Sequence, residues 1–173
     1  YKFSQEYASS DGFAPREGGT PKPSVNEREA LDRWILSFLG STTGSVRAAL
    51  DSYDFHAAAG RLEEFLDGLS NWYLRRSRDR GWSKASPENT AKWSFWWTLY
   101  EVMSTLARLM APFTPFLAED LYRVLDRELG QDAAESVHLC DYPQADDSLK
   151  DVALEARMAL ARQVVNLGMH VRS

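Results

Sequence analysis

The sequence contains very little cysteine: Cys140 is the only one in 173 residues. A single thiol cannot form an internal disulfide or a zinc site built from cysteines. Its presence without a partner fits a reducing compartment, and we expect a cytoplasmic protein. Neither a GxGxxG segment nor a Walker A phosphate loop occurs in the chain. We therefore expect no nucleotide cofactor to bind these residues.

Metal-ligating and catalytic patterns are also missing. The three histidines are far apart in sequence and lack the i, i+4 spacing of a helical metal site: His56, His138 and His170. The paired acids at 63–64 and 146–147 are adjacent, so their side chains do not share a helical face. No apolar run reaches the roughly 18 residues of a membrane-spanning helix. We expect no catalytic residue, no metal, no cofactor and no membrane partner for this chain.

Apolar and aromatic residues are plentiful. The hydrophobic share is 44%, with six Trp, seven Tyr and eight Phe. A domain of this length buries roughly 70% of the surface that its unfolded chain exposes, so it needs no disulfide or metal for stability. The totals therefore indicate one globular domain of ordinary size.

Five stretches place apolar residues at spacings of three and four, which predicts helices. The first follows a capping-box pattern at Ser24 and Glu27 and extends to about residue 53, with glycines at 40 and 44 where we expect it to bend or break. The second begins at Asp54 and ends near Gly81. These two helices carry the best-defined apolar stripes in the chain.

The remaining helices are predicted from caps and prolines. Ser86-Pro87-Glu88 starts the third, because proline suits the first turn and an acid suits the positive end of the helix dipole. Prolines 112 and 115 end it, a fourth follows to Gly130, and a fifth starts near Asp147. Residues 135–143 look extended. The expected fold is an all-α bundle of four to five helices with a short extended segment near 135–143.

The domain boundaries follow from the same patterns. Residues 1–23 are rich in Gly, Ser and Pro and are predicted to form a connector. Residues 24–143 form the bundle, and 144–173 form a carboxyl-terminal helix. We expect the chain to be part of something longer.

Basic residues are concentrated in one window of an acidic chain. The formal net charge is −5, yet residues 71–84 carry five basic residues against one acid, a net +4, which leaves −9 for the remainder. Aromatic residues lie among them. At 100° per residue, Tyr73, Arg76 and Arg80 fall along one line, and Trp72, Arg75 and Arg78 along its neighbour, with Trp82 and Lys84 just beyond.

Alternating rings and guanidinium groups suit single-stranded RNA, because unstacked bases lie on aromatic faces and arginines grip phosphates. The alternative is structural: the arginines pair with acids of neighbouring helices, and the tryptophans close the end of the bundle. The residues alone leave both readings open. A second aromatic cluster, Trp93, Trp96 and Trp97, has the spacing of core packing, with contact to another domain or protein as its alternative.

Several segments together resemble the anticodon-binding domain of class I isoleucyl-tRNA synthetases. They are DRWIL at 32–36, NWYLRRSR at 71–78, LMAPFTPF at 109–116, AEDLY at 118–122 and ESVHLCDYP at 135–143. The third and fourth are shared with the valine and leucine enzymes, whereas the second and fifth resemble the isoleucine enzyme. Gly81 departs from the family, which usually has a Phe there, and this puts the end of that helix in doubt.

The resemblance implies a role within a larger enzyme. The bundle would hold the anticodon stem-loop of isoleucine-accepting tRNA, while other domains of the parent, an ATP-dependent isoleucine–tRNA ligase that can also contain zinc, perform the chemistry. The RNA-binding residues would be those of the basic window: Trp72, Tyr73, Arg75, Arg76, Arg78, Arg80, Trp82 and Lys84. The alternatives are the same domain of a valyl or leucyl enzyme, a helical protein-interaction module anchored on Trp93, Trp96 and Trp97, or a bundle enzyme, which lacks the needed Glu-x-x-His spacing.

Overall fold

The structure is a computed structural model that describes residues 10–15, 19–127 and 134–170. Its main helices are α2 (Ala30–Asp51), α3 (Phe55–Asp67), α4 (Arg75–Trp82), α5 (Thr90–Met110), α6 (Pro115–Tyr122) and α7 (Val152–His170). Short 3-10 turns cover Val25–Glu27, Val137–Leu139 and Asp147–Leu149, and π-helical turns cover Gly68–Leu74 and Arg123–Arg127. No β-strand occurs in these described ranges. The predicted all-α fold is confirmed.

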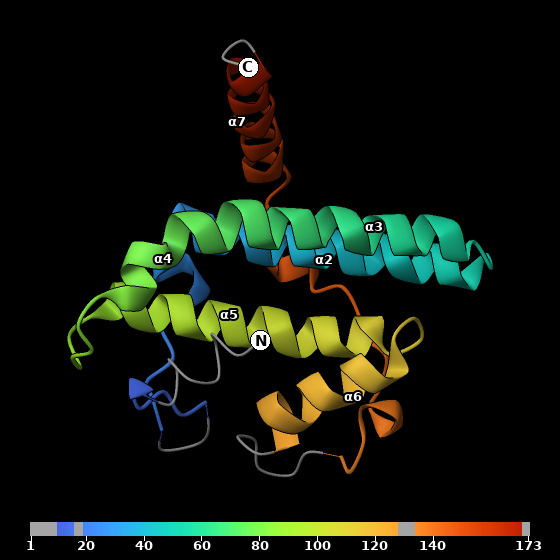
Figure 1. Cartoon of the computed structure of the whole chain (residues 1–173), viewed down its shortest axis with the longest axis horizontal. Helices are drawn as coiled ribbons and strands as arrows, with labels where there is room; N and C mark the ends of the chain where they lie inside the picture. Colours follow the sequence, from blue (N-terminus) through green and yellow to red (C-terminus); the bar gives the residue numbers. More distant parts are fainter. Residues whose placement is uncertain (1–9, 16–18, 128–133, 171–173) are drawn as a thin grey trace.

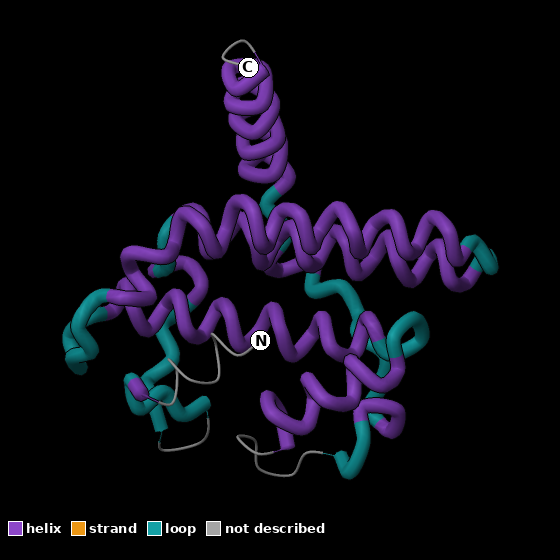
Figure 2. The backbone as a smooth tube through the Cα atoms, viewed as in Figure 1, coloured by secondary structure: helices purple, strands orange, loops and turns teal. Residues whose placement is uncertain are grey.

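The helices form a bundle with one projecting arm. Helices α2 and α3 lie side by side and run in opposite directions, α5 runs alongside them, and α6 packs against the carboxyl-terminal end of α5 (Figure 1). Helix α7 leaves this body and contacts it mainly through α2 (Figure 2). It exposes Leu160, Val164 and Leu167 to solvent.

The core lies where α2, α3 and α5 meet. Its largest fully buried side chains include Ile35, Phe65, Tyr73, Phe95 and Trp96. A smaller cluster joins α5 and α6 around Ala107, Ala118, Leu121, Tyr122 and Val137. Burying this much aromatic surface is the main stabilising contribution of the fold.

The start of α2 differs from the prediction. Glu27 Oε2 accepts a hydrogen bond from the Ser24 backbone N–H at 3.2 Å, as a capping box requires, but this pattern begins only the short 3-10 turn. The long helix starts at Ala30. The glycines at 40 and 44 do not interrupt the helix, because α2 is continuous through both. A Cβ at either position would lie 3.7 Å from residues 145–146, an ordinary contact distance, so both glycines lie beneath that segment without being required by it.

The predicted second helix is one continuous helical stretch made of three parts. Asp54 caps it by accepting a hydrogen bond from the Ala57 N–H at 2.9 Å, as expected. After α3, the π-helical segment Gly68–Leu74 rotates less per residue than an α-helix, and α4 then continues to Trp82. The π segment therefore changes which residues of α4 face the bundle.

Three further predictions need correction. Helix α5 is capped by Asn89, whose side chain accepts from the Lys92 N–H at 3.1 Å, and not by Ser86, because the Ser86-Pro87-Glu88 segment forms the preceding turn. Residues 135–143 are not extended throughout: Ser136 caps the 3-10 turn Val137–Leu139. The last helix begins at Val152, after a separate 3-10 turn at Asp147. The predicted end of the fourth helix at Gly130 lies outside the described residues.

Candidate nucleic-acid interface

Helix α4 has an inner face that packs on α2 and α5. Ser77 and Gly81 are buried there, and Arg80 points inward between them. Each of the three lies one helical turn or less from the next, so they share one side of the helix. The inner face fixes how the rest of α4 meets solvent.

The inner face is tied to α2 by a buried carboxylate. Asp32 has no exposed surface and receives three hydrogen bonds. Arg80 donates two of them in a fork, Nη1 to Oδ2 at 2.7 Å and Nη2 to Oδ1 at 2.9 Å, and the Tyr73 hydroxyl donates the third to Oδ1 at 2.7 Å. Arg80 also donates to Ser77 Oγ at 2.8 Å. Two-pronged pairing of this kind fixes both distance and orientation.

The electrostatics of this network keep Tyr73 and Arg80 in their usual protonation states. Burial raises the pKa of Tyr73 well above 10, and the nearby Asp32 charge and hydrogen bond raise it further. Burial alone would lower the pKa of Arg80, but the hydrogen bonds and charge of Asp32 outweigh it and the pKa is raised. Tyr73 therefore stays neutral and Arg80 stays charged throughout the ordinary pH range.

The carboxyl end of α4 is held by a second buried charge. Lys92 of α5 is 2% exposed, donates from Nζ to the carbonyl oxygens of Gly81 and Ser83, and forms an ion pair with Asp11 at 2.7 Å. A cation suits the negative end of the helix dipole. Gly81 is required at this contact, because a Cβ there would lie 2.8 Å from the Phe95 ring. Phe95 thus fills the space that a larger residue at position 81 would need.

The outer face of α4 carries two arginine–indole stacks. The Arg78 guanidinium carbon lies 4.0 Å from the ring centroid of Trp82, which is 51% exposed. The Arg76 guanidinium carbon lies 4.4 Å from the ring centroid of Trp72, which is 9% exposed. Stacking of this kind holds the guanidinium plane in place and leaves its N–H groups available to an outside acceptor.

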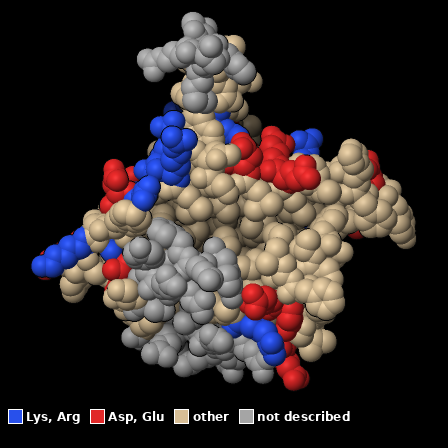
Figure 3. Space-filling view, viewed as in Figure 1, with Lys and Arg blue, Asp and Glu red and all other residues tan. Residues whose placement is uncertain are grey.

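The basic residues of the outer face have no ion-pair partner among the described residues. Arg75, Arg76, Arg78 and Lys84 are all exposed. In the part of the chain that the structure describes, no carboxylate lies within 4.0 Å of any of the four. Basic side chains lie on the surface between the base of α7 and the end of the bundle where α4 lies (Figure 3).

The eight residues of the predicted site therefore separate into two groups. Tyr73, which has no exposed surface, and Arg80, which is paired with Asp32, belong to the packing between helices and offer nothing to a base. Trp72 is mostly covered and supports Arg76. The outer group contains Arg75, Arg76, Arg78, Trp82 and Lys84. The predicted lines of residues were wrong, since Arg76 faces outward over Trp72 while Tyr73 and Arg80 face inward.

Two charged residues that organise this region were missed as site residues. Asp32 precedes Ile35, Leu36 and Leu39 at spacings of three, four and seven, and Lys92 precedes Phe95, Trp96 and Leu99 in the same way. A charge at an apolar position of an amphipathic helix must be paired when it is buried. That rule, applied to the sequence, would have indicated both residues.

The tryptophan cluster of α5 is part of the core. Trp96 and Trp97 are 1% and 8% exposed, and Trp97 Nε1 donates to the Pro21 carbonyl oxygen at 3.0 Å. Trp93 is half-buried and donates from Nε1 to the Ser86 carbonyl oxygen at 2.8 Å. The expectation of core packing is confirmed, and these rings do not form an external anchor.

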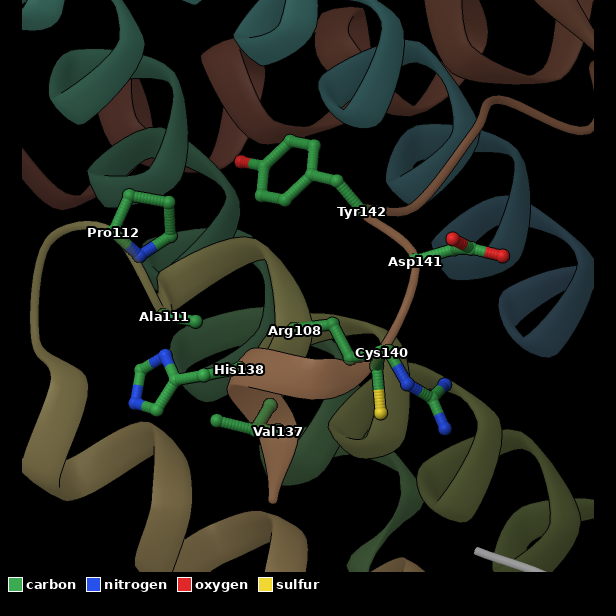
Figure 4. Close-up of a pocket in the computed structure, with 8 residues that line it drawn as sticks. All are labelled: Arg108, Ala111, Pro112, Val137, His138, Cys140, Asp141 and Tyr142. Carbon is green, nitrogen blue, oxygen red and sulfur yellow. The ribbon is translucent and has the colours of Figure 1, made fainter. Parts of the chain in front are cut away.

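A pocket lies at the other end of α5. It is lined by Arg108, His138, Cys140 and Tyr142, among others (Figure 4). Burial raises the pKa of Tyr142 to about 12, and its hydroxyl donates to the Leu109 carbonyl oxygen at 3.1 Å, so it supplies no base. Within the described ranges, no three His, Cys, Asp or Glu side chains are grouped as a metal ion requires. Nor does any described helix combine the length and apolarity needed to cross a membrane.

Comparison with known proteins assigns the fold. The family described as "Anticodon-binding domain of tRNA ligase" matches residues 32–173. The chain belongs to this family. The matched range includes all of α4. It begins at Asp32, the residue that pairs with Arg80 on the inner face of α4.

Similar proteins are longer. The chain is 43% identical over 173 residues to an isoleucine–tRNA ligase of Clostridium novyi and 44% identical over the same length to one of Dehalococcoides mccartyi. An isoleucine–tRNA ligase of Streptomyces avermitilis is 43% identical, with 99% of the chain covered. The chain spans about 16% of the first two relatives and 15% of the third.

Proposed function

We propose that the chain binds the anticodon stem-loop of an isoleucine-accepting tRNA, as one domain of an isoleucine–tRNA ligase. The observation that carries this proposal is the outer face of α4. There, three exposed arginines and Lys84 have no carboxylate partner among the described residues, and Trp82 offers an exposed ring. Family membership supplies the class of ligand.

The recognition chemistry follows from the two kinds of group on that face. Arg75, Arg76, Arg78 and Lys84 donate to phosphate oxygens of the loop or to acceptor atoms on base edges. Trp82 stacks on an unpaired base, a contact worth roughly 1–3 kcal/mol. An anticodon loop presents both features together, since its unpaired bases can be splayed out and its phosphates are exposed.

In this proposal the remaining domains of the parent enzyme activate isoleucine with ATP and join it to the tRNA. The described residues contribute binding and orientation only. The stretch from 1 to 23 acts as the connector from the catalytic domain, and residues 144–173 lead toward further domains that contact the same RNA.

A direct titration tests the proposal. The chain is titrated into labelled isoleucine tRNA at several salt concentrations, with fluorescence anisotropy as the readout. Neutralising about four phosphates of a single strand gives a log–log salt slope near −3, or roughly a 50-fold loss of affinity between 50 and 200 mM salt. A hairpin with the anticodon loop should compete with the tRNA, whereas an acceptor-stem hairpin of equal length should not.

A matched pair of variants assigns the surface. Replacing Arg75 and Arg78 with Ala removes two outer arginines, and replacing Arg61 and Arg157 removes two exposed arginines from other helices, α3 and α7. Both double variants change the net charge equally. We expect the first to weaken binding at least tenfold and the second to have little effect. Absence of binding at low salt, or equal effects of the two pairs, would refute the assignment.

A further inference from the structure

Helix α7 brings a second arginine to the indole of Trp72. The guanidinium carbon of Arg162 lies 5.8 Å from the centroid of that ring, on which Arg76 of α4 also lies at 4.4 Å. Two arginines from helices far apart in sequence therefore share one aromatic ring. Figure 3 shows basic side chains in this region, between α4 and the base of α7.

The Arg162 side chain is held in place and remains reachable. Its Nη2 forms an ion pair with Asp67 Oδ2 at 2.7 Å, and the side chain retains 20% of its exposure. Gly68 lies beneath this contact: a Cβ there would lie 2.9 Å from the Phe38 ring, too close without a shift, and at an ordinary contact distance of 3.6 Å from Arg162 Nη1. A guanidinium group has five N–H donors, so the bond to Asp67 leaves others for a second acceptor.

We propose that Arg162 extends the RNA-binding surface from α4 onto α7, and that the phosphate backbone of the bound strand crosses the Trp72 indole between Arg76 and Arg162. This proposal rests on RNA binding by the outer face of α4. The Trp72 ring is mostly covered, so it serves as a platform that orients two guanidinium groups and does not itself stack on a base. Oriented donors bind phosphate with less loss of side-chain entropy than free ones.

The competing explanation is that Arg162 only fastens α7 to the bundle through Asp67. Both explanations predict that loss of Arg162 weakens RNA binding, directly in one case and through a displaced helix in the other. They differ over Asp67. If Arg162 contacts phosphate, the Asp67 charge opposes binding; if Arg162 is only a fastener, Asp67 is its necessary partner.

Three single variants of the chain separate these explanations. The affinity of each is measured with the same labelled tRNA. Arg162→Ala should weaken binding about fivefold and make the salt slope shallower by about 0.7, the value for one phosphate contact on a single strand. Arg157→Ala is the matched control: it lies on α7, is exposed, and donates from Nε to the Ala153 carbonyl oxygen of its own helix. It should leave affinity and slope unchanged.

The direction in which Asp67→Asn changes tRNA affinity decides between the two explanations. It removes the negative charge but keeps an oxygen that can accept from Arg162, and it should tighten binding by up to about twofold at low salt. Weaker binding by both Asp67→Asn and Arg162→Ala, with faster hydrogen exchange of the α7 amides, would overturn the proposal in favour of a fastener. Equal affinities of the Arg162 and Arg157 variants would overturn it too.

The outcome remains distinct from that of the proposed function. If the Arg75 and Arg78 double variant loses binding while Arg162→Ala retains it, α4 binds RNA and α7 does not. If the unaltered chain fails to bind tRNA, both proposals fall together.

Discussion

On the inner face of α4, Arg80 forms a forked pair with a carboxylate that has no exposed surface; on the outer face, two residues earlier, Arg78 lies on a half-exposed indole. The two residues are of the same type in the same turn of helix. Arg80 holds the helix to its neighbours, and its charge is cancelled where it lies. Arg78 has no carboxylate partner among the described residues.

The comparison shows how a bundle with net charge −5 can present a basic surface. A small number of buried ionic contacts on the inner face fix the orientation of α4. That orientation points the arginines of the outer face toward solvent. Preorganised donors bind better than mobile ones, because ordering them during binding costs entropy. Stability should therefore depend on the inner face, and RNA affinity on the outer one.

The largest effect is expected from Asp32→Ala. It leaves the Arg80 guanidinium and the Tyr73 hydroxyl without their shared acceptor, and breaking a buried pair on one side costs about 3–5 kcal/mol. Urea unfolding followed by circular dichroism measures it. Asp79→Ala, an exposed acid of α4, is the control and should stay within about 0.5 kcal/mol of the unaltered chain. A small effect of Asp32→Ala would mean that the buried network does not fix α4.

Trp82→Ala should weaken tRNA binding and leave stability nearly unchanged, the opposite of the effect expected for Asp32→Ala. Loss of one base-stacking contact is worth roughly 1–3 kcal/mol of tRNA affinity, while the half-exposed ring contributes little to folding. Anisotropy titration and urea unfolding on the same samples measure the two quantities. Phe55→Ala removes another exposed ring, 58% exposed and far along the α2–α3 hairpin, and should change neither affinity nor salt dependence. If both variants bind tRNA equally well, Trp82 does not stack on a base.

Alkaline pH should reduce the contribution of Tyr73, on the inner face, to the free energy of unfolding. Tyr73 has a folded-state pKa raised well above 10, so the unfolded chain loses that proton first. Its contribution to stability is complete below pH 10 and is lost as pH rises, by up to about 1.4 kcal/mol per unit until the folded-state pKa is reached. Unfolding free energies from pH 9 to 11 should therefore fall less steeply for Tyr73→Phe.

Tyr142→Phe serves as a comparison for that titration. Its folded-state pKa is about 12, so it also contributes above pH 10, but it lies in the pocket at the far end of α5. Its removal should leave the contribution of Tyr73 intact. An identical pH dependence for the unaltered chain and Tyr73→Phe would show that the Tyr73 hydroxyl is not buried in solution.

The smallest effect on stability is expected from Arg75→Ala. The side chain is exposed, and no described residue forms an ion pair with it, so the free energy of unfolding should change by less than about 0.5 kcal/mol. The same variant should bind tRNA more weakly and with a shallower salt dependence. A clear loss of stability would place Arg75 in the inner group with Arg80.

Much of the fold followed from local patterns. The apolar spacing predicted the helices, and Asp54 was recognised as a cap because its side chain acts on a backbone N–H only three residues away. The start of α5 was placed too early because Ser86 and Asn89 both suit a cap, and the geometry of the intervening turn chooses between them. The 3-10 turn at Val137 was missed because three residues are too short to show a periodicity.

The candidate site was predicted less completely. The basic window was located correctly on the chain, and which of its residues bind RNA stays a prediction. Arg76 and Arg80 lie one turn apart within α4, and their spacing placed them on one line, but Arg80 turns inward to Asp32 while Arg76 lies over Trp72. Asp32 was quoted only as part of a motif, although its carboxylate decides the orientation of Arg80.

The sequence by itself determined the all-α architecture, the position of the cationic window and the family resemblance, because these depend on residue types and short-range spacing. Only the tertiary structure decided which arginines turn inward. Asp32 is 41 residues from Tyr73 and 48 from Arg80, and Arg162 reaches Asp67 across 95 residues. A buried charge is stable only beside its partner, so the helices must be packed together before an arginine is committed to the interior or left to a ligand.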